Sequence, residues 1–261
     1  MTRPLPGSRF LPRGLSLLYE DADVLVVDKP PGLLTMGNAS ERERTVYVAL
    51  TDYVRKGQAK SRKRVFIVHR LDRETSGLLV FARTEEAKRA LQEGWDETSK
   101  TYIAVVHGRV EKDEGVITSW LVENSAFVVF STQDTTKGKQ ARTGYRVLHR
   151  TAHRSLIELD LFTGRKHQIR VHMADLGHAL LGDTRYGKAK DPVKRLALHA
   201  HTLAFTHPRT GERLEFLAPV TGELLQMTGK LPGGVLRMLQ QGRRGEEASE
   251  VAERNPTGCR S

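Results

Sequence analysis

The sequence predicts an α+β fold with a mixed, largely antiparallel central sheet and flanking helices. Segments of strand-like composition outnumber segments with helical periodicity, and the two kinds do not alternate along the chain. That order argues against a doubly wound parallel sheet. Hydrophobic residues make up 38% of the 261 residues, which is enough for an ordinary core. We expect an N-terminal extension over 1–14, one domain over 15–220, and a helical or disordered tail over 221–261.

The first part of the chain is predicted to form two strands and a helix. Leu15–Tyr19 and Val24–Val27 are short aliphatic runs, and Lys29-Pro30-Pro31-Gly32 then forms a rigid turn. After Thr45, a suitable N-cap, apolar residues recur at helical spacing and predict a helix over about 46–55. The strongly basic residues that follow, up to Arg64, are predicted to form a loop.

The middle of the chain is predicted to be mostly strands. Ile67-Val68 and Leu78–Phe81 are apolar runs on either side of a polar loop, and Thr84 with two glutamates begins a helix. Four more segments have strand-like composition: Tyr102–Val106, Phe127–Phe130, Gly144–Leu148 and Leu156–Phe162. The last of them alternates polar and apolar residues, which is typical of a half-buried strand.

The last third is predicted to contain one helix and two strands. Ile169, Met173 and Leu176 fall on one helical stripe, which Gly177 can end with a left-handed C-cap, and Arg170 lies on the polar face. Strands over Leu198–Phe205 and Leu214–Leu217 complete the sheet. The polar segment Gln240–Ser261 is predicted to be disordered.

The charge balance points to a polyanionic partner. The formal net charge is +11, and clustered cations gain affinity for phosphates by releasing counterions. The single cysteine, Cys259, excludes a disulfide framework and a cysteine zinc site. No secretory signal is visible, and no apolar run approaches the about 18 residues of a membrane span. We expect a cytoplasmic protein, with a monomer as the simplest state and no membrane partner.

The densest group of ionisable residues spans 69–77, His-Arg-Leu-Asp-Arg-Glu-Thr-Ser-Gly. It lies between two predicted strands, where a loop can present it to a ligand. A solvated turn with a local ion pair between Asp72 and an arginine is the ordinary alternative. A kinase catalytic loop is excluded because Leu71 interrupts the H-R-D pattern, and neither a glycine-rich phosphate loop nor D-F-G occurs.

This segment resembles the hallmark of the RluA-type family of pseudouridine synthases, in which His-Arg-Leu-Asp precedes Thr-Ser-Gly. Further blocks similar to the family occur in the same order: Lys29-Pro30-Pro31-Gly32, Lys100-Thr101-Tyr102, residues 164–172 (GRKHQIRVH), Gly182-Asp183 with Tyr186-Gly187, and residues 195–200 (RLALHA). Together they span roughly residues 15–220, and several co-linear motifs rarely coincide by chance. Many relatives carry an additional RNA-binding domain ahead of this region, and we expect it to be absent here.

The resemblance implies an isomerase that converts uridine to pseudouridine in structured transfer RNA or ribosomal RNA, without a cofactor. It implies that Asp72 is the catalytic carboxylate, Tyr102 stacks on the target base, Arg170 pairs with Asp72, and Arg70 displaces the base. The chemistry supports these roles, because the reaction cleaves N1–C1′, turns the uracil and joins C5 to C1′. An ionised carboxylate can attack the sugar or the ring, or remove a ribose proton, and Arg170 favours its charged form.

Other residues in these motifs are candidates for RNA binding. They are His69, Arg73, Thr75, Lys100, Arg165, Lys166 and His167. Cations position RNA through its phosphates, although any of them can equally be ordinary surface charge. A paired uridine must also be flipped out, and Tyr102 offers it a stacking surface worth about 1–3 kcal/mol.

Three other hypotheses compete with the isomerase. A metal site is suggested by two histidine groups, one at His167, His172 and His178 and one at His199 and His201. We expect no metal, because few carboxylates stand at metal-ligand spacing from these histidines and the isomerisation needs no Lewis acid. An unrelated hydrolase lacks a Gly-x-Ser-x-Gly elbow. A non-catalytic RNA-binding or RNA-chaperone protein on the same fold is disfavoured by the intact site residues.

Overall fold

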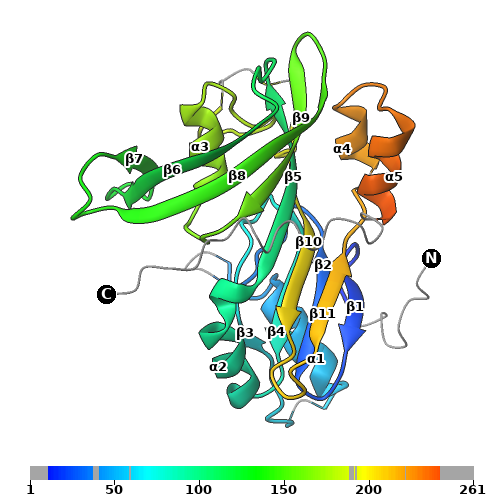
Figure 1. Ribbon diagram of the computed structural model, residues 1–261. Helices are drawn as coiled ribbons and strands as arrows, with labels where there is room; N and C mark the ends of the chain where they lie inside the picture. Colours follow the sequence, from blue (N-terminus) through cyan, green and yellow to red (C-terminus); the bar gives the residue numbers. More distant parts are fainter. Residues whose placement is uncertain are drawn as a thin grey trace.

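The computed structural model describes residues 11–37, 41–58, 60–187, 191, 193–220 and 222–241, and within them an eleven-stranded sheet (Figure 1). Cys259 and the predicted disorder beyond residue 241 lie outside these residues, as do the first ten residues of the predicted extension. The strands are β1 (Ser16–Glu20), β2 (Val24–Lys29), β3 (Phe66–Ile67), β4 (Ser76–Ala82), β5 (Ser99–His107), β6 (Glu114–Glu123), β7 (Val129–Thr132), β8 (Lys139–Arg150), β9 (Arg154–Leu161), β10 (Leu198–Thr206) and β11 (Arg213–Leu217). The helices are α1 (Val46–Arg55), α2 (Glu85–Glu93), α3 (Gln168–Asp175), α4 (Gly222–Gln226) and α5 (Gly233–Gln241), with a 3-10 turn at Trp95–Glu97.

The sheet is mixed and largely antiparallel. Its strands follow the order β1-β2-β4-β10-β5-β9-β8-β6-β7, with β3 paired to β4 and β11 to β10. Of these neighbours, β4 and β10 run parallel, and the others are antiparallel. The predicted α+β class is therefore confirmed. No described helix is long and apolar enough to cross a membrane.

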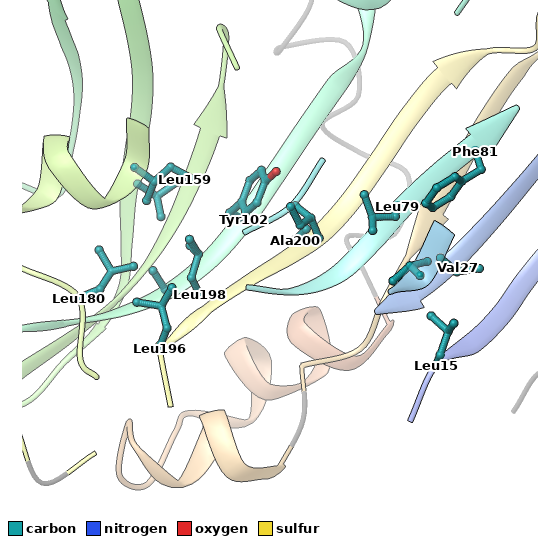
Figure 2. Packing of buried hydrophobic residues seen from close by; sticks show 14 of the residues in the cluster. Leu15, Val27, Leu79, Phe81, Tyr102, Leu159, Leu180, Leu196, Leu198 and Ala200 are labelled. Carbon is teal, nitrogen blue, oxygen red and sulfur yellow. The ribbon is translucent and has the colours of Figure 1, made fainter. Parts of the chain in front are cut away.

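Helices cover both faces of the sheet. Val27 and Leu79 pack with α1, whereas their chain neighbours Val26 and Leu78 pack with α2 on the opposite face. On β5, Tyr102 points to the face of α1 and α3, and alternate residues of that strand pack with α4 and α5. Figure 2 shows the first of these cores running without a break across β2, β4, β10 and β5. One face thus carries a continuous core under both halves of the sheet.

The elements with strong local signals lie close to where the sequence predicts them. Helix α1 begins after Thr45, whose side-chain oxygen accepts a hydrogen bond from the Val48 amide. Helix α2 begins in the same way after Thr84, which accepts from Ala87. Helix α3 is followed by Gly177, which has a positive φ of 82° as the predicted left-handed C-cap requires.

Two strands differ from the sequence prediction. The predicted strand Phe127–Phe130 begins only at Val129, because Asn124 folds residues 124–128 into a turn with its side-chain oxygen. Strand β6 was not predicted, and most of its side chains are partly or fully exposed. The predicted helical or disordered tail contains α4 and α5, which bury Leu224 and Leu239 against β5 and β9. Gln240 and Gln241, predicted to be disordered, form the end of α5, because the preceding residues of that helix pack on the sheet.

Strand β10 lies at the centre of the sheet and contacts β4 on one side and β5 on the other. At the β4 contact, Gly77 has a φ of +110°, and a Cβ there would lie 2.1 Å from the carbonyl oxygen of Ala200. A glycine is required at this position, since both the backbone angle and the close approach exclude a side chain. The loop that precedes β4 is thereby tied to the centre of the fold.

We expect Gly77→Ala to lower the free energy of unfolding by about 3 kcal/mol, because the added methyl group meets backbone in a strained conformation. Gly233→Ala is a matched control, since nothing lies near its added Cβ, and it should change stability by less than about 1 kcal/mol. Urea unfolding of both variants measures the difference. Equal stability of the two variants would contradict the assigned packing.

Candidate active site

The loop between β3 and β4 presents Asp72 from a fixed backbone. On one side, Leu71 is buried, and both its amide and its carbonyl oxygen bond the hydroxyl of Thr35, at 3.2 and 2.9 Å. On the other side, the carbonyl oxygen of Arg73 accepts the amide hydrogen of Gly32 at 2.9 Å. The Asp72 side chain itself is 31% exposed. The carboxylate is therefore accessible, while the residues next to it are held in place.

Lys29 is a buried amine beneath this loop. Its side chain has no solvent-exposed surface, and its Nζ donates to the carbonyl oxygens of Pro30, Leu33 and Arg73, each at 2.9 Å. One ammonium group thus joins the turn after β2 to the backbone next to Asp72. Burial lowers the pKa of Lys29 to about 7. The nearby negative charges of Glu74 and Asp72 act in the opposite direction and offset only part of this effect. This residue positions the loop.

Lys29→Met leaves three buried carbonyl groups without their donor, and we expect it to lower the free energy of unfolding by about 3 kcal/mol. The difference should grow with pH. The pKa of Lys29 is about 7 in the folded protein and 10.5 ordinarily. Between these pH values the folded protein binds fewer protons than the unfolded chain, so the stability of the wild type rises as the pH rises. Urea unfolding of both proteins at pH 6, 8 and 10 measures this. A pH-independent difference would contradict the lowered pKa.

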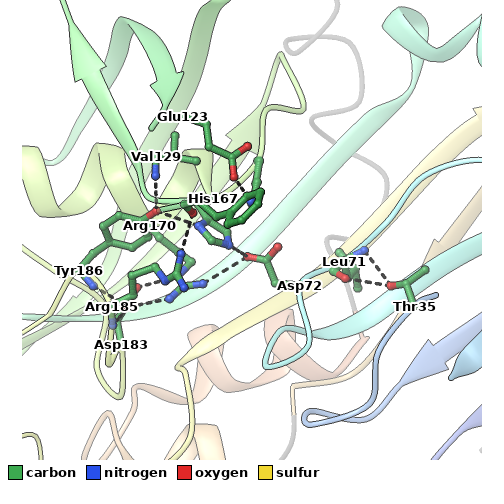
Figure 3. Close-up of polar contacts among 12 residues, drawn as sticks. Thr35, Leu71, Asp72, Glu123, Val129, His167, Arg170, Asp183, Arg185 and Tyr186 are labelled. Atoms are coloured by element: carbon green, nitrogen blue, oxygen red, sulfur yellow. Dashed lines mark hydrogen bonds and ion pairs between the residues drawn. The ribbon is translucent and has the colours of Figure 1, made fainter. Parts of the chain in front are cut away.

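Arg170, on α3, joins Asp72 to a second, buried aspartate. Its Nε and Nη2 each donate to one carboxylate oxygen of Asp183 at 2.8 Å, and its Nη1 lies 3.5 Å from Oδ2 of Asp72 (Figure 3). Asp183 also accepts from the amides of Arg185 and Tyr186. Burial alone would raise the pKa of Asp183, but the bonds from Arg170 lower it. The guanidinium is held by Asp183 so that its third nitrogen faces Asp72.

His167 and Tyr186 complete the wall beside Asp72. His167 Nε2 lies 3.7 Å from Oδ2 of Asp72, and its Nδ1 lies 2.8 Å from the Tyr186 hydroxyl. The amide of Val129 donates to that hydroxyl, which favours a tyrosine proton directed at Nδ1 and a ring proton on Nε2. Burial lowers the pKa of His167, although Asp72 opposes this. The ring of Tyr186 also lies under Arg170, with the guanidinium carbon 5.1 Å from its centroid.

Tyr102 and Arg70 lie at different depths. Tyr102 is only 8% exposed and belongs to the core on the α3 face. Burial raises the pKa of its hydroxyl, and the charge of Asp72 raises it further, so the ring is neutral and electrostatically coupled to the carboxylate. Arg70 is exposed, and its Nη1 lies 3.7 Å from the sulfur of Met36.

The other predicted RNA-binding residues fall into two groups. His69, Thr75 and Lys100 make contacts inside the protein: His69 packs on Trp95, and Lys100 lies over the same ring. Burial lowers the pKa of His69 to about 3 and that of Lys100 to about 8. Three others have more accessible side chains: Arg73, Arg165 and Lys166. The structure brings His167 to Asp72, buries Lys100 and leaves His69 only partly exposed.

The remaining histidines of the two sequence groups bond protein atoms. His172 contacts the hydroxyls of Thr143 and Ser119, and His199 contacts the hydroxyl of Ser76. Burial lowers the pKa of His172 and of His199 to about 4. Within the part of the chain that the structure describes, three potential ligand atoms meet at Asp21, Asp23 and His207, where Asp23 already pairs with Arg209.

The sheet with its covering helices is the pseudouridylate synthase fold. It matches a human structure titled RNA pseudouridylate synthase domain containing 4 with a TM-score of 0.68, at 23% identity over 85% of this chain and 92% of that one. Human RNA pseudouridylate synthase domain containing 1 matches with a TM-score of 0.63, at 26% identity over 79% of this chain and 84% of that one. These two structures show that the chain has the fold of the RNA pseudouridylate synthases.

Sequence similarity identifies the family of this chain. The RNA pseudouridylate synthase family model matches residues 23–175. The chain is 38% identical over 211 residues to the dual-specificity RNA pseudouridine synthase RluA of Yersinia pestis, covering 77% of this chain and 96% of that protein. It is equally identical over 217 residues to the large-subunit pseudouridine synthase D of Nitrosomonas europaea, covering 77% of this chain and 60% of that protein. The chain belongs to the RluA-type RNA pseudouridine synthases, which are isomerases acting on RNA.

Proposed function

We propose that this protein isomerises specific uridines of ribosomal RNA or transfer RNA, with Asp72 as its catalytic carboxylate. The observation that carries the proposal is the arrangement around Asp72. Its carboxylate is accessible, its backbone is fixed on both sides, and its Oδ2 lies 3.5 Å from an arginine that is itself held by buried Asp183. A charged group that is accessible yet rigidly placed is suited to reaction with a bound substrate.

The chemistry makes use of each of these groups. Asp72 acts either as a nucleophile toward C1′ or the ring, or as a base on the ribose, and in each route it reacts as the anion. Arg170 balances that charge without leaving Asp183. His167, with its proton on Nε2, faces the same carboxylate oxygen at 3.7 Å and adds a neutral donor. Cleavage of N1–C1′ releases the uracil, which turns and forms the C5–C1′ bond. C5 loses its hydrogen as a proton, and N1 takes up a proton.

Tyr102 and Arg70 serve the base rather than the sugar. A uridine in a stem or stacked loop must leave its stack before it reaches Asp72. Exposed Arg70, two residues before the carboxylate, takes the space that the base vacates. Tyr102, neutral and on the face of the sheet that carries α3, gives the detached uracil a flat surface on which to turn.

Accessible cations position the RNA. Arg73, Arg165 and Lys166 are our candidates for phosphate contacts, since phosphate binding needs accessible charge. Lys100 is not included, because it is buried against Trp95. One relative acts, by its name, on large-subunit ribosomal RNA, and the name of another gives it dual specificity, so the proposal is not restricted to one RNA class.

The test uses two separate pools, ribosomal RNA and transfer RNA, each transcribed with tritium at C5 of uridine. Wild-type protein should release tritium to water from at least one pool, with Asp72→Asn as the background, and reverse-transcription stops after carbodiimide treatment should identify the position. Salt-sensitive binding to both pools without release by wild-type protein would instead support a non-catalytic RNA-binding protein.

A further inference from the structure

The turn before β7 presents an exposed aromatic side chain next to the candidate active site. Phe127 is 68% exposed, the most exposed of the large hydrophobic residues in the described part of the chain. It is also one of three described residues other than glycine with a positive φ, at 58°. A turn of this kind normally places glycine or asparagine at such a position, because a bulky residue is strained there. Neither the backbone conformation nor solvent exposure favours a phenylalanine at this position.

Contacts connect Phe127 to the residues beside Asp72. His167 faces Asp72, and its chain neighbour Lys166 places its ammonium group 5.5 Å from the Phe127 ring centroid. Tyr186 bonds His167, and its chain neighbour Arg185 donates to the Phe127 carbonyl oxygen at 2.7 Å. In each of the adjacent pairs Lys166-His167 and Arg185-Tyr186, one residue therefore contacts Phe127 and the other belongs to the wall beside Asp72.

The surface around this ring is basic. Lys166 and Arg185 are both exposed, and Lys166 also pairs with Glu123, which holds its amine near the ring. An aromatic ring with one cation over it and a second cation bonded to its backbone suits a nucleotide, whose base stacks on the ring while its phosphate meets the charges. A protein partner would find one large exposed apolar side chain in the turn 124–128, bordered by charged side chains.

We propose that Phe127, Lys166 and Arg185 form a nucleotide-binding subsite that holds an unpaired base of the substrate RNA next to the flipped uridine. This rests on the proposed function, because it assigns a second nucleotide to the same site. The stacked base stabilises the opened RNA conformation, which the enzyme needs before the target uridine can reach Asp72.

The test compares wild-type protein with variants at Phe127 and Phe130 by RNA affinity and by kcat/KM for tritium release, with the ribosomal RNA and transfer RNA pools as probes. Phe127→Gly should weaken binding and lower kcat/KM about 10-fold, as expected for the loss of one stacked base. Phe127→Trp should retain both. Phe130→Ala removes another exposed phenylalanine of this hairpin, outside the subsite, and should behave like wild type.

Two further readouts separate stacking from structural and charge effects. Phe127→Gly should leave the unfolding temperature unchanged or raised, because glycine relieves the positive φ. It should also leave the slope of log affinity against log salt unchanged, whereas Lys166→Gln should reduce that slope by about 1.

Wild-type affinity and turnover in Phe127→Gly, or an equal loss in Phe130→Ala, would overturn the subsite. If wild-type protein releases no tritium but the affinities still follow the predicted pattern, the proposed activity fails and the subsite stands as an RNA-binding surface.

Discussion

Asp72→Asn is expected to lower kcat/KM for tritium release by about 10³-fold or more, since an amide can neither attack carbon nor accept a proton as a carboxylate does. The substitution keeps the shape of the side chain and removes its charge. Because the side chain is partly exposed and its neighbours are anchored through their backbone, the fold should survive. Single-turnover assays with excess enzyme measure the chemical step.

The control for Asp72→Asn is Asp175→Asn, which removes the same charge from an exposed position at the end of α3. Asp175→Asn should keep wild-type turnover, and both variants should keep wild-type RNA affinity within a few-fold. Equal activity in the two variants would show that Asp72 is not the catalytic group. Lost RNA affinity in Asp72→Asn would indicate a binding role instead.

Arg170→Met should affect both stability and activity. It removes the partner of Asp183, whose carboxylate is fully buried, and we expect the free energy of unfolding to fall by about 3–5 kcal/mol. The cation beside Asp72 is lost at the same time, so the turnover of the folded protein should also fall. Urea unfolding and tritium release below the unfolding transition measure the two effects separately.

The double variant Arg170→Met, Asp183→Asn separates these effects further. Asparagine removes the buried charge, and its oxygen can still accept the amides of Arg185 and Tyr186, which both bond Oδ1 in the wild type. Stability should largely return, whereas activity should stay low because Asp72 still lacks its cation. Restored activity would mean that Arg170 has only a structural role.

Local sequence signals predicted the elements that depend on local interactions. Helix α1 follows from the cap at Thr45 and its apolar spacing, and the observed bounds Val46–Arg55 agree with them. Strand β6 has no comparable signal, because it is half-exposed and is held by pairing with β7 and β8. Helices α4 and α5 are short and contain or follow glycines, so burial against the sheet stabilises them more than propensity does.

The candidate site was predictable to the extent that its residues are adjacent in sequence. Asp72 stands within one compact motif, whereas the bidentate bond from Arg170 to Asp183 and the hydroxyl of Tyr186 near His167 depend on how α3 packs against the following loop. Asp183 and Tyr186 occur in a family-like block, but spacing alone assigns them no role. The three carbonyl contacts of Lys29 are likewise visible only in the folded backbone.

The central position of β10 has a consequence for synthesis on the ribosome. The strand completes the sheet between β4 and β5, yet the ribosome makes it after both of them. A nascent chain that already contains Asp72 and Arg170 still exposes the hydrophobic edges of β4 and β5, which are open to aggregation until residue 206 emerges. We therefore expect the newly made protein to acquire activity only late in translation, and to depend on chaperones until then.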